Sequence, residues 1–174
     1  MEPHEQIERL CNRFEIAVSN FGRSCIDMEA NEKAFQAWYA SSVIQEFGIS
    51  HVYREIHLWK KELFFLAPPN KLTAQLEKGN ELFPDIAISW FPNLDTRHSS
   101  TRDPSIRDAG SFLSEFSVLS ELKVTGSTST PTPKAAILKD IAKLYVFMAA
   151  HRSFSETNGL NRPLKGLYGY SRQC

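Results

Sequence analysis

The chain is poor in cysteine and has no long hydrophobic run, and both absences restrict what it can be. Its three cysteines, Cys11, Cys25 and Cys174, form no C-x-x-C pair, which argues against a disulfide framework or a zinc site and fits a reducing cytoplasm. No segment approaches the roughly 20 apolar residues of a membrane span. The first ten residues are acidic and polar, unlike a signal peptide. We therefore expect a cytoplasmic protein without a membrane partner.

Net charge is also missing, because 20 basic residues balance 20 acidic ones. The overall charge therefore gives no support to a nucleic-acid partner, but its distribution is uneven. Residues 1–50 carry 4 basic and 8 acidic groups, whereas residues 121–174 carry 8 basic and 3 acidic groups. A phosphate-facing side would produce this asymmetry, and a chance fluctuation is the alternative. The sequence contains no internal repeat, P-loop, nucleophile elbow or paired-histidine zinc motif.

What the chain does contain is the composition of one globular domain over residues 1–174, with 42% hydrophobic and 23% charged residues. Apolar residues at three- and four-residue spacing predict a helix over 4–22, within an N-terminal extension of residues 1–30. A second helix is predicted from Asn31 or Glu32 to Phe47, with Gly48 just beyond its end. The apolar row of this helix consists of Phe35, Tyr39, Val43 and Phe47.

Three β-like runs follow the second helix, at residues 50–59, 83–90 and 111–124, and each is apolar and β-prone. Residues 70–80 are polar and fit a short helix or a loop. Residues 91–110 are charged and turn-rich, which predicts a loop between two strands. We interpret His51 and His57 in the first run as surface or edge residues, because they lack ligand spacing on one compact face.

A third helix is predicted from about Pro133 to His151, with Thr132 as its N-cap. We expect Lys139 and Lys143 on its solvated face. Its buried stripe is expected to consist of Ile137, Ile141, Leu144, Tyr145 and Met148. These elements give a core over 31–152, and the tail at 153–174 could add a short last strand at 164–170.

Three acidic residues and one lysine occupy noteworthy places in these elements. Glu121-Leu122-Lys123 ends the third run, and in a strand Glu121 and Lys123 share a face. Asp85 follows Pro84 at the start of the second run, and Glu32 lies one turn before Phe35 on the inward side of its helix. Each has a simpler explanation: a solvated ion pair, a turn aspartate and an acid that favours the helix dipole. Glu29 competes with Glu32 for the inward position.

The order of the elements, together with Pro84-Asp85 and Glu121-Leu122-Lys123, resembles the PD-(D/E)xK nuclease superfamily over Glu32 to about Arg152. The resemblance implies the restriction endonuclease-like α/β fold, with a central mixed β-sheet flanked by helices. It implies Mg²⁺, for which Mn²⁺ could substitute, held by Asp85, Glu121 and the backbone carbonyl of Leu122. Lys123 would stabilise developing negative charge, and Glu32 would bind metal-site water or a second ion. The implied activity is hydrolysis of DNA phosphodiester bonds to 5′-phosphates.

Three basic residues are candidates for contact with DNA: Lys134 at the start of the third helix, and Arg102 and Arg107 in the 91–110 loop. Solvated loop charge is the alternative for the two arginines. Two other functions stay open. One is a degenerate module of the same fold that binds nucleic acid or protein without cutting, and the other is an unrelated α/β domain in which Glu-x-Lys is coincidental. The sequence leaves strandedness, DNA against RNA and oligomeric state open, with a homodimer as one option.

Overall fold

The computed structural model describes residues 3–26, 28, 30–76, 79–97, 108–125 and 134–172. Within these residues the chain forms five α-helices, one 3-10 helix and six strands. In chain order they are α1 (Pro3–Ser24), α2 (Glu32–Phe47), β1 (Val52–Arg54), β2 (Leu58–Trp59), α3 (Lys60–Leu66), η1 (Thr73–Leu76), β3 (Glu81–Leu82), β4 (Ile86–Ser89), α4 (Ala109–Leu113), β5 (Phe116–Thr125), α5 (Lys134–Asn158) and β6 (Lys165–Arg172).

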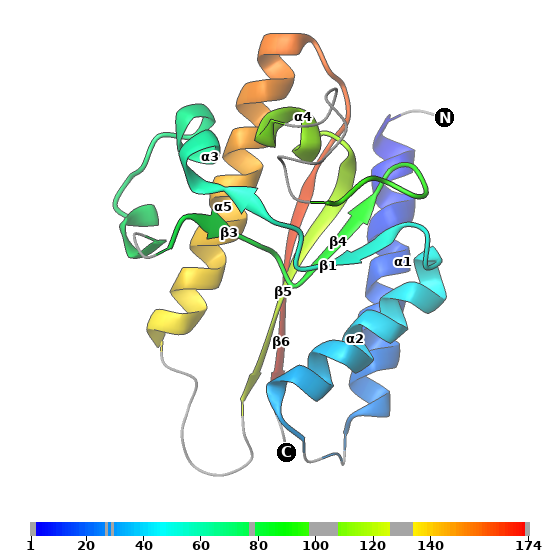
Figure 1. The fold of residues 1–174 in the computed structure, drawn as a ribbon. Coiled ribbons are helices and arrows are strands. Elements are labelled where there is room, and N and C mark those ends of the chain that lie inside the picture. The colour runs from blue at the N-terminus through cyan, green and yellow to red at the C-terminus, as the bar shows by residue number, and fades with distance from the viewer. Residues whose placement is uncertain are drawn as a thin grey trace.

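The central sheet has four strands in the order β1-β4-β5-β6, and β2 and β3 form a separate two-stranded sheet. β1, β4 and β5 are antiparallel neighbours, whereas β6 runs parallel to β5. Parallel neighbours need a crossover connection, and the long helix α5 supplies it (Figure 1). The prediction of an α/β fold with a central mixed sheet flanked by helices is confirmed at this level.

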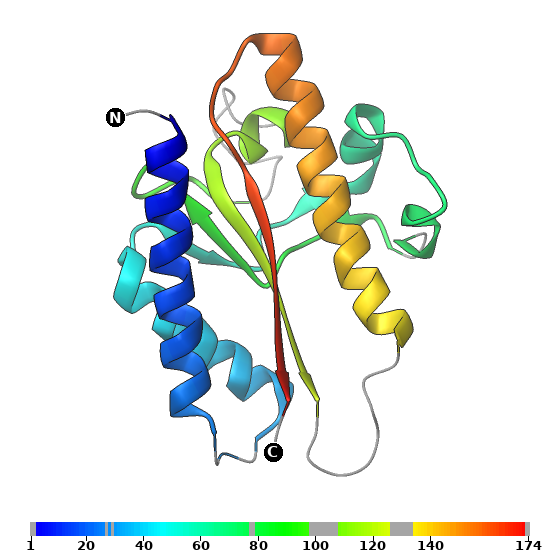
Figure 2. The same cartoon turned by 180° about the vertical axis from the view of Figure 1, so that it is seen from behind.

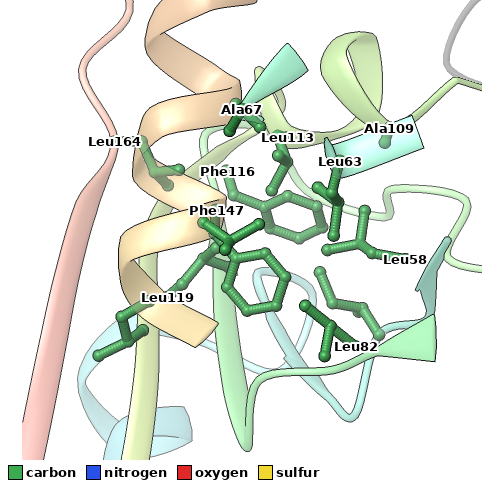
Figure 3. Close-up of a cluster of buried hydrophobic side chains, with 14 of the residues drawn as sticks. Leu58, Leu63, Ala67, Leu82, Ala109, Leu113, Phe116, Leu119, Phe147 and Leu164 are labelled. Atoms are coloured by element: carbon green, nitrogen blue, oxygen red, sulfur yellow. The ribbon is translucent and has the colours of Figure 1, made fainter. Parts of the chain in front are cut away.

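Helices cover both faces of the central sheet (Figures 1 and 2). The helices α1 and α2 pack on one face, where an apolar cluster joins Phe14, Phe35 and Tyr39 to Ile86, Val118 and Leu122 of the strands. The opposite face carries α3, α4 and α5 (Figure 3). There Leu119 of β5 and Phe147 of α5 belong to one cluster with Leu58, Leu63 and Leu113. Alternate strand residues therefore separate into the two cores, as a two-sided sheet requires.

The first two helices begin and end close to where the sequence predicts. Asn31 caps α2, because its side chain accepts a hydrogen bond from the backbone N–H of Ala34 at 3.0 Å. Gly48 ends α2 with a positive φ of 83°, a conformation that glycine adopts without steric cost. Phe35, Tyr39 and Val43 are buried, which confirms the inward direction of the predicted apolar row.

The run at 50–59 does not form one strand, and this prediction is wrong. Glu55 has a positive φ of 50°, which breaks the extended backbone between β1 and β2. β1 then pairs with β4 in the central sheet, whereas β2 pairs with β3 in the small sheet. The chain continues directly into the helix α3, which the sequence pattern does not predict.

The strand predicted over 111–124 also starts later than expected. Residues Ala109–Leu113 form the short helix α4, and Asp108 caps it by accepting hydrogen bonds from the N–H groups of Gly110 and Ser111. β5 begins only at Phe116. Asp108 and the start of α4 lie at the edge of the predicted loop 91–110, whose residues 98–107 are outside the described part of the chain.

Helix α5 exposes part of the stripe that was predicted to be buried. Ile141 and Tyr145 are exposed, whereas the buried side contains Asp140, Phe147, Ala150 and His151. The prediction of the buried side is wrong because that side carries polar residues in the first turns of the helix. The positions of the apolar residues alone therefore indicate a side that is rotated about the helix axis from the buried one. α5 also extends to Asn158, beyond the predicted end at His151, and Thr132 and Pro133 lie outside the described residues.

The chain closes the central sheet with β6, which confirms the predicted short last strand. Across the described residues, none of the helices combines the length and apolarity needed to cross a bilayer.

Candidate functional site

Two carboxylates meet where β4 begins and β5 continues beyond it. Ile86 is paired with Ser120 in the antiparallel ladder, so Asp85, just before β4, and Glu121, just after Ser120, come to the same end of neighbouring strands. One carboxylate oxygen of Asp85 (Oδ2) accepts a hydrogen bond from the backbone N–H of Leu122 at 2.7 Å. Glu121 lies two residues after Leu119 in the same strand, so both side chains are on the face that α5 covers.

Asp85 is held by groups from two elements. Besides the N–H of Leu122, Gln36 of α2 donates from Nε2 to Asp85 Oδ1 at 3.1 Å. Burial raises the pKa of Asp85, while the hydrogen bond from Leu122 and the positive charge of Lys143 oppose this change. Asp85 is thus fixed in orientation in a partly desolvated position.

Glu121 is the most deeply buried acid of the site, with an exposed fraction of 1%. Its Oε2 accepts a hydrogen bond from Lys143 Nζ at 2.7 Å. Its Oε1 is buried and has no hydrogen-bond partner in the described structure. Burial raises the pKa of Glu121 to about 8, although Lys143 opposes the change. A buried carboxylate oxygen without a partner costs free energy, so Glu121 is suited to a ligand that supplies positive charge.

The lysines of the site pair with acids from three elements. Lys123 Nζ lies 3.0 Å from Glu32 Oε1 of α2 and 3.8 Å from Asp140 Oδ2 of α5. Lys143 Nζ lies 3.3 Å from Asp140 Oδ1. Burial lowers the pKa of both lysines, but the surrounding carboxylates outweigh it and the pKa of each is raised. Both side chains therefore stay cationic.

The predicted residues Asp85, Glu121, Lys123 and Glu32 come together through these contacts. Glu32 is reached through Lys123 and is half-exposed, with 43% of its side-chain surface accessible. Lys134 is exposed in the first turn of α5 and forms no hydrogen bond or ion pair with the described residues of the site. Glu29, Arg102 and Arg107 lie outside the described residues.

Sequence reasoning missed three residues of the site: Gln36, Asp140 and Lys143. The prediction that Lys143 is solvated is wrong, because only 13% of its side chain is accessible and it pairs with two acids. Lys139 is exposed, as predicted. Asp140 and Lys143 lie seven and four residues before Phe147 on the same helix side. The apolar pattern of this helix points to another side and therefore gives no signal for them.

A pocket of about 270 Å³ opens beside these groups. Its lining includes Lys123, Lys139, Asp140 and Lys143, together with Glu81 and Leu82 of the two-stranded sheet. Three lysines and two acids line this opening, so the lining has a slight excess of positive charge.

The available donors fit a hard divalent cation. Asp85 and Glu121 offer carboxylate oxygens, and Leu122, between Glu121 and Lys123 in the sequence, offers a backbone carbonyl oxygen. No group of three or more His, Cys, Asp or Glu side chains in the described ranges is arranged to hold a metal. An ion would therefore complete its shell with carbonyl oxygen and water, which suits Mg²⁺ better than zinc. Comparison of the chain with protein-family models, with curated proteins and with solved structures finds no significant match.

Proposed function

We propose that this protein is a divalent-metal-dependent nuclease of the PD-(D/E)xK type that hydrolyses DNA phosphodiester bonds. The observation that carries the proposal is the buried, unpartnered Oε1 of Glu121 beside Asp85, at the end of β5 that also bears Lys123. Around the central sheet, α2 is followed by the antiparallel strands β1, β4 and β5, and then by α5 and the parallel strand β6, with β2, α3, η1, β3 and α4 inserted between the antiparallel strands. This order of the sheet elements supports a restriction endonuclease-like core.

In this proposal Asp85, Glu121 and the carbonyl of Leu122 hold Mg²⁺, and Mn²⁺ substitutes for it. The ion, when bound, supplies positive charge at the scissile phosphate and lowers the pKa of a water molecule. Gln36 and the N–H of Leu122 keep the Asp85 carboxylate in orientation. Such supporting hydrogen bonds commonly tune metal ligands.

The remaining charged residues act on the substrate side of the site. Lys123 is paired with half-exposed Glu32, so a phosphate that approaches through the pocket can replace that carboxylate as its partner. Its ammonium would stabilise the negative charge that develops during hydrolysis. Lys143 neutralises Glu121 and Asp140 and keeps the buried side chains in place. Before a substrate binds, Glu32 positions Lys123.

The proposed substrate is DNA and the product a 5′-phosphate, with the basic excess of residues 121–174 turned toward the phosphate backbone. The same proposal places the protein in the cytoplasm, where it would act as a monomer or a homodimer.

A second function is favoured by one observation. Glu121 is paired with Lys143 and Lys123 with Glu32, so the site satisfies most of its charge without any ligand. A nuclease-fold module that binds nucleic acid or protein without cutting would need no more than this network.

Cleavage of supercoiled, linear and single-stranded DNA separates the two functions. We expect wild-type protein to cut in Mg²⁺ or Mn²⁺, to stop in EDTA, and to lose activity in Asp85→Asn and Glu121→Gln. Glu15→Gln on the exposed side of α1 is the matched control and should cut normally. Binding of DNA without cleavage under all these conditions would favour the inactive module, and cleavage that persists in EDTA would contradict the proposed chemistry.

A further inference from the structure

A second pocket lies at the opposite end of the central strands. It has a volume of about 380 Å³ and lies between α1 and the end of β4. Its strand residues are Ile88 and Ser89 of β4 and Ser117 of β5. Asp85 precedes β4 and Ser89 ends it, so roughly 13 Å of strand separates this pocket from the carboxylate site.

All charged side chains that line this pocket are basic. Arg9 and Arg13 come from α1, and Gln6 occupies the same helix face one turn earlier. His51 adds an imidazole, whose Nδ1 is 3.1 Å from the carbonyl oxygen of Ser89. Arg9 is exposed and forms no ion pair with any residue that the structure describes. The lining therefore offers cationic donors without a competing carboxylate.

The guanidinium of Arg13 is held in place before any ligand binds. It donates to the backbone carbonyl of Glu46 near the end of α2 and lies over the ring of Phe47, 4.5 Å from the centroid. A guanidinium has five N–H donors, so this arrangement leaves others for a ligand. An ordered arginine loses less conformational entropy on binding than a free one.

Trp90 adds a buried donor at this pocket. Its indole Nε1 is buried and has no hydrogen-bond partner within the described residues, although the ring lines the pocket. Trp90 and Gln6 also line an adjoining pocket of about 190 Å³ that contains Arg162. Gln6 is exposed and lines both pockets together with Trp90. An indole N–H only donates, so its missing partner must be an acceptor.

We propose that this pocket, lined by Arg9, Arg13, His51 and Trp90, binds the phosphate group of a nucleotide-sized ester. Arginine forks match phosphate oxygens in geometry and charge, and the indole N–H adds a donor. The volume suits a small molecule rather than a bare ion. The phosphate could belong to a free mononucleotide or to the 5′-end of a DNA strand, and both present the same group.

The test is calorimetric titration in EDTA, which excludes a contribution from metal-assisted binding at the carboxylate site. The probes are AMP, inorganic pyrophosphate, and one oligonucleotide with and without its 5′-phosphate. We expect one binding event for AMP. Arg9→Ala and Arg13→Lys should each weaken it roughly tenfold or more. Arg13→Lys keeps the positive charge but loses the paired N–H donors of the guanidinium. Trp90→Phe, which keeps an aromatic ring and loses the N–H, should weaken binding by roughly tenfold.

Two controls locate the binding. Arg23→Ala, at the far end of α1, and Asp85→Asn, at the carboxylate site, should leave the AMP affinity unchanged. Tighter binding of the oligonucleotide with its 5′-phosphate than of the same oligonucleotide without it would assign the phosphate to a strand end. Equal affinity of the two oligonucleotides, with AMP bound, would assign it to a free nucleotide. The proposal is overturned if no probe binds, or if the folded Arg9→Ala and Arg13→Lys variants bind AMP as the wild type does.

Discussion

Lys143 Nζ lies 2.7 Å from Glu121 Oε2, which joins α5 to β5 inside the protein. Glu121 has an exposed fraction of only 1% in this pair. The contact links the stability of the fold to the candidate site, because the same carboxylate has a second oxygen without a partner. Changes at Lys143 should therefore affect both properties.

We predict that Lys143→Met destabilises the protein in EDTA by about 1–3 kcal/mol, because Glu121 loses its cationic partner and must either take up a proton or stay buried as an uncompensated charge. Glu121→Met combined with Lys143→Met should recover much of this loss, since apolar pairs replace buried ion pairs at little cost. Urea unfolding monitored by circular dichroism measures both. Lys139→Met, exposed on the same helix, should change the free energy of unfolding by less than about 0.5 kcal/mol. A double variant that is no more stable than Lys143→Met alone would contradict the pairing.

We predict that Gln36→Ala weakens Mn²⁺ binding by roughly 10-fold to 100-fold, the usual effect of losing a group that orients a metal ligand. The reason is the hydrogen bond from Gln36 Nε2 to Asp85 Oδ1. Gln45→Ala, an exposed position on the same helix, is the matched control and should not alter the affinity. Equal affinities in the two variants would show that Gln36 does not position Asp85.

Two glycine-to-alanine substitutions should change the free energy of unfolding in opposite directions. A Cβ on Gly110 would lie 2.3 Å from a ring atom of Phe154, so Gly110→Ala should lower the free energy of unfolding by about 1–3 kcal/mol. A Cβ on Gly22 in α1 would meet nothing within 4 Å, and Gly22→Ala should raise it by about 0.5–1 kcal/mol. Thermal unfolding of both variants measures this difference. A stabilising Gly110→Ala would mean that α4 does not pack against α5 in this way.

His151 should make stability fall in acid. Burial lowers the pKa of His151 in the folded protein below its usual 6.5, so the unfolded chain binds the proton first as the pH falls. The contribution of neutral His151 is therefore complete above about pH 6.5 and is lost progressively as the pH drops toward the folded-state pKa. Urea unfolding from pH 8 to pH 5 should show a shallower decline for His151→Gln than for wild type. Parallel profiles would rule out this role of His151.

The sequence predicts the elements whose signal is local. The helix α2 has both a cap at Asn31 and a stop at Gly48, and the runs that become β4 and β5 are apolar. It does not reveal the break at Glu55, because nothing about a glutamate indicates a positive φ. Periodicity also points to the wrong side of α5, where buried Asp140 and Lys143 stand in place of apolar residues.

The same limit applies to the candidate site. Asp85, Glu121 and Lys123 lie in or beside strands, so their alternation could be predicted from spacing. Gln36 and Asp85 are 49 positions apart in the sequence, so their contact depends on how α2 packs against the sheet. Such contacts follow from tertiary packing, and no local pattern encodes them.

The most direct test of the proposed metal site is a Mn²⁺ titration followed by electron paramagnetic resonance, on wild type, Asp85→Asn, Glu121→Gln and Lys123→Ala. We expect ion binding in wild type and its loss in both carboxylate variants. Lys123→Ala should bind Mn²⁺ as well as or slightly better than wild type, because a nearby positive charge is removed, while its DNA cleavage falls roughly 10²–10³-fold. Absence of Mn²⁺ binding in wild type, or binding that is unchanged in Asp85→Asn and Glu121→Gln, would contradict the account.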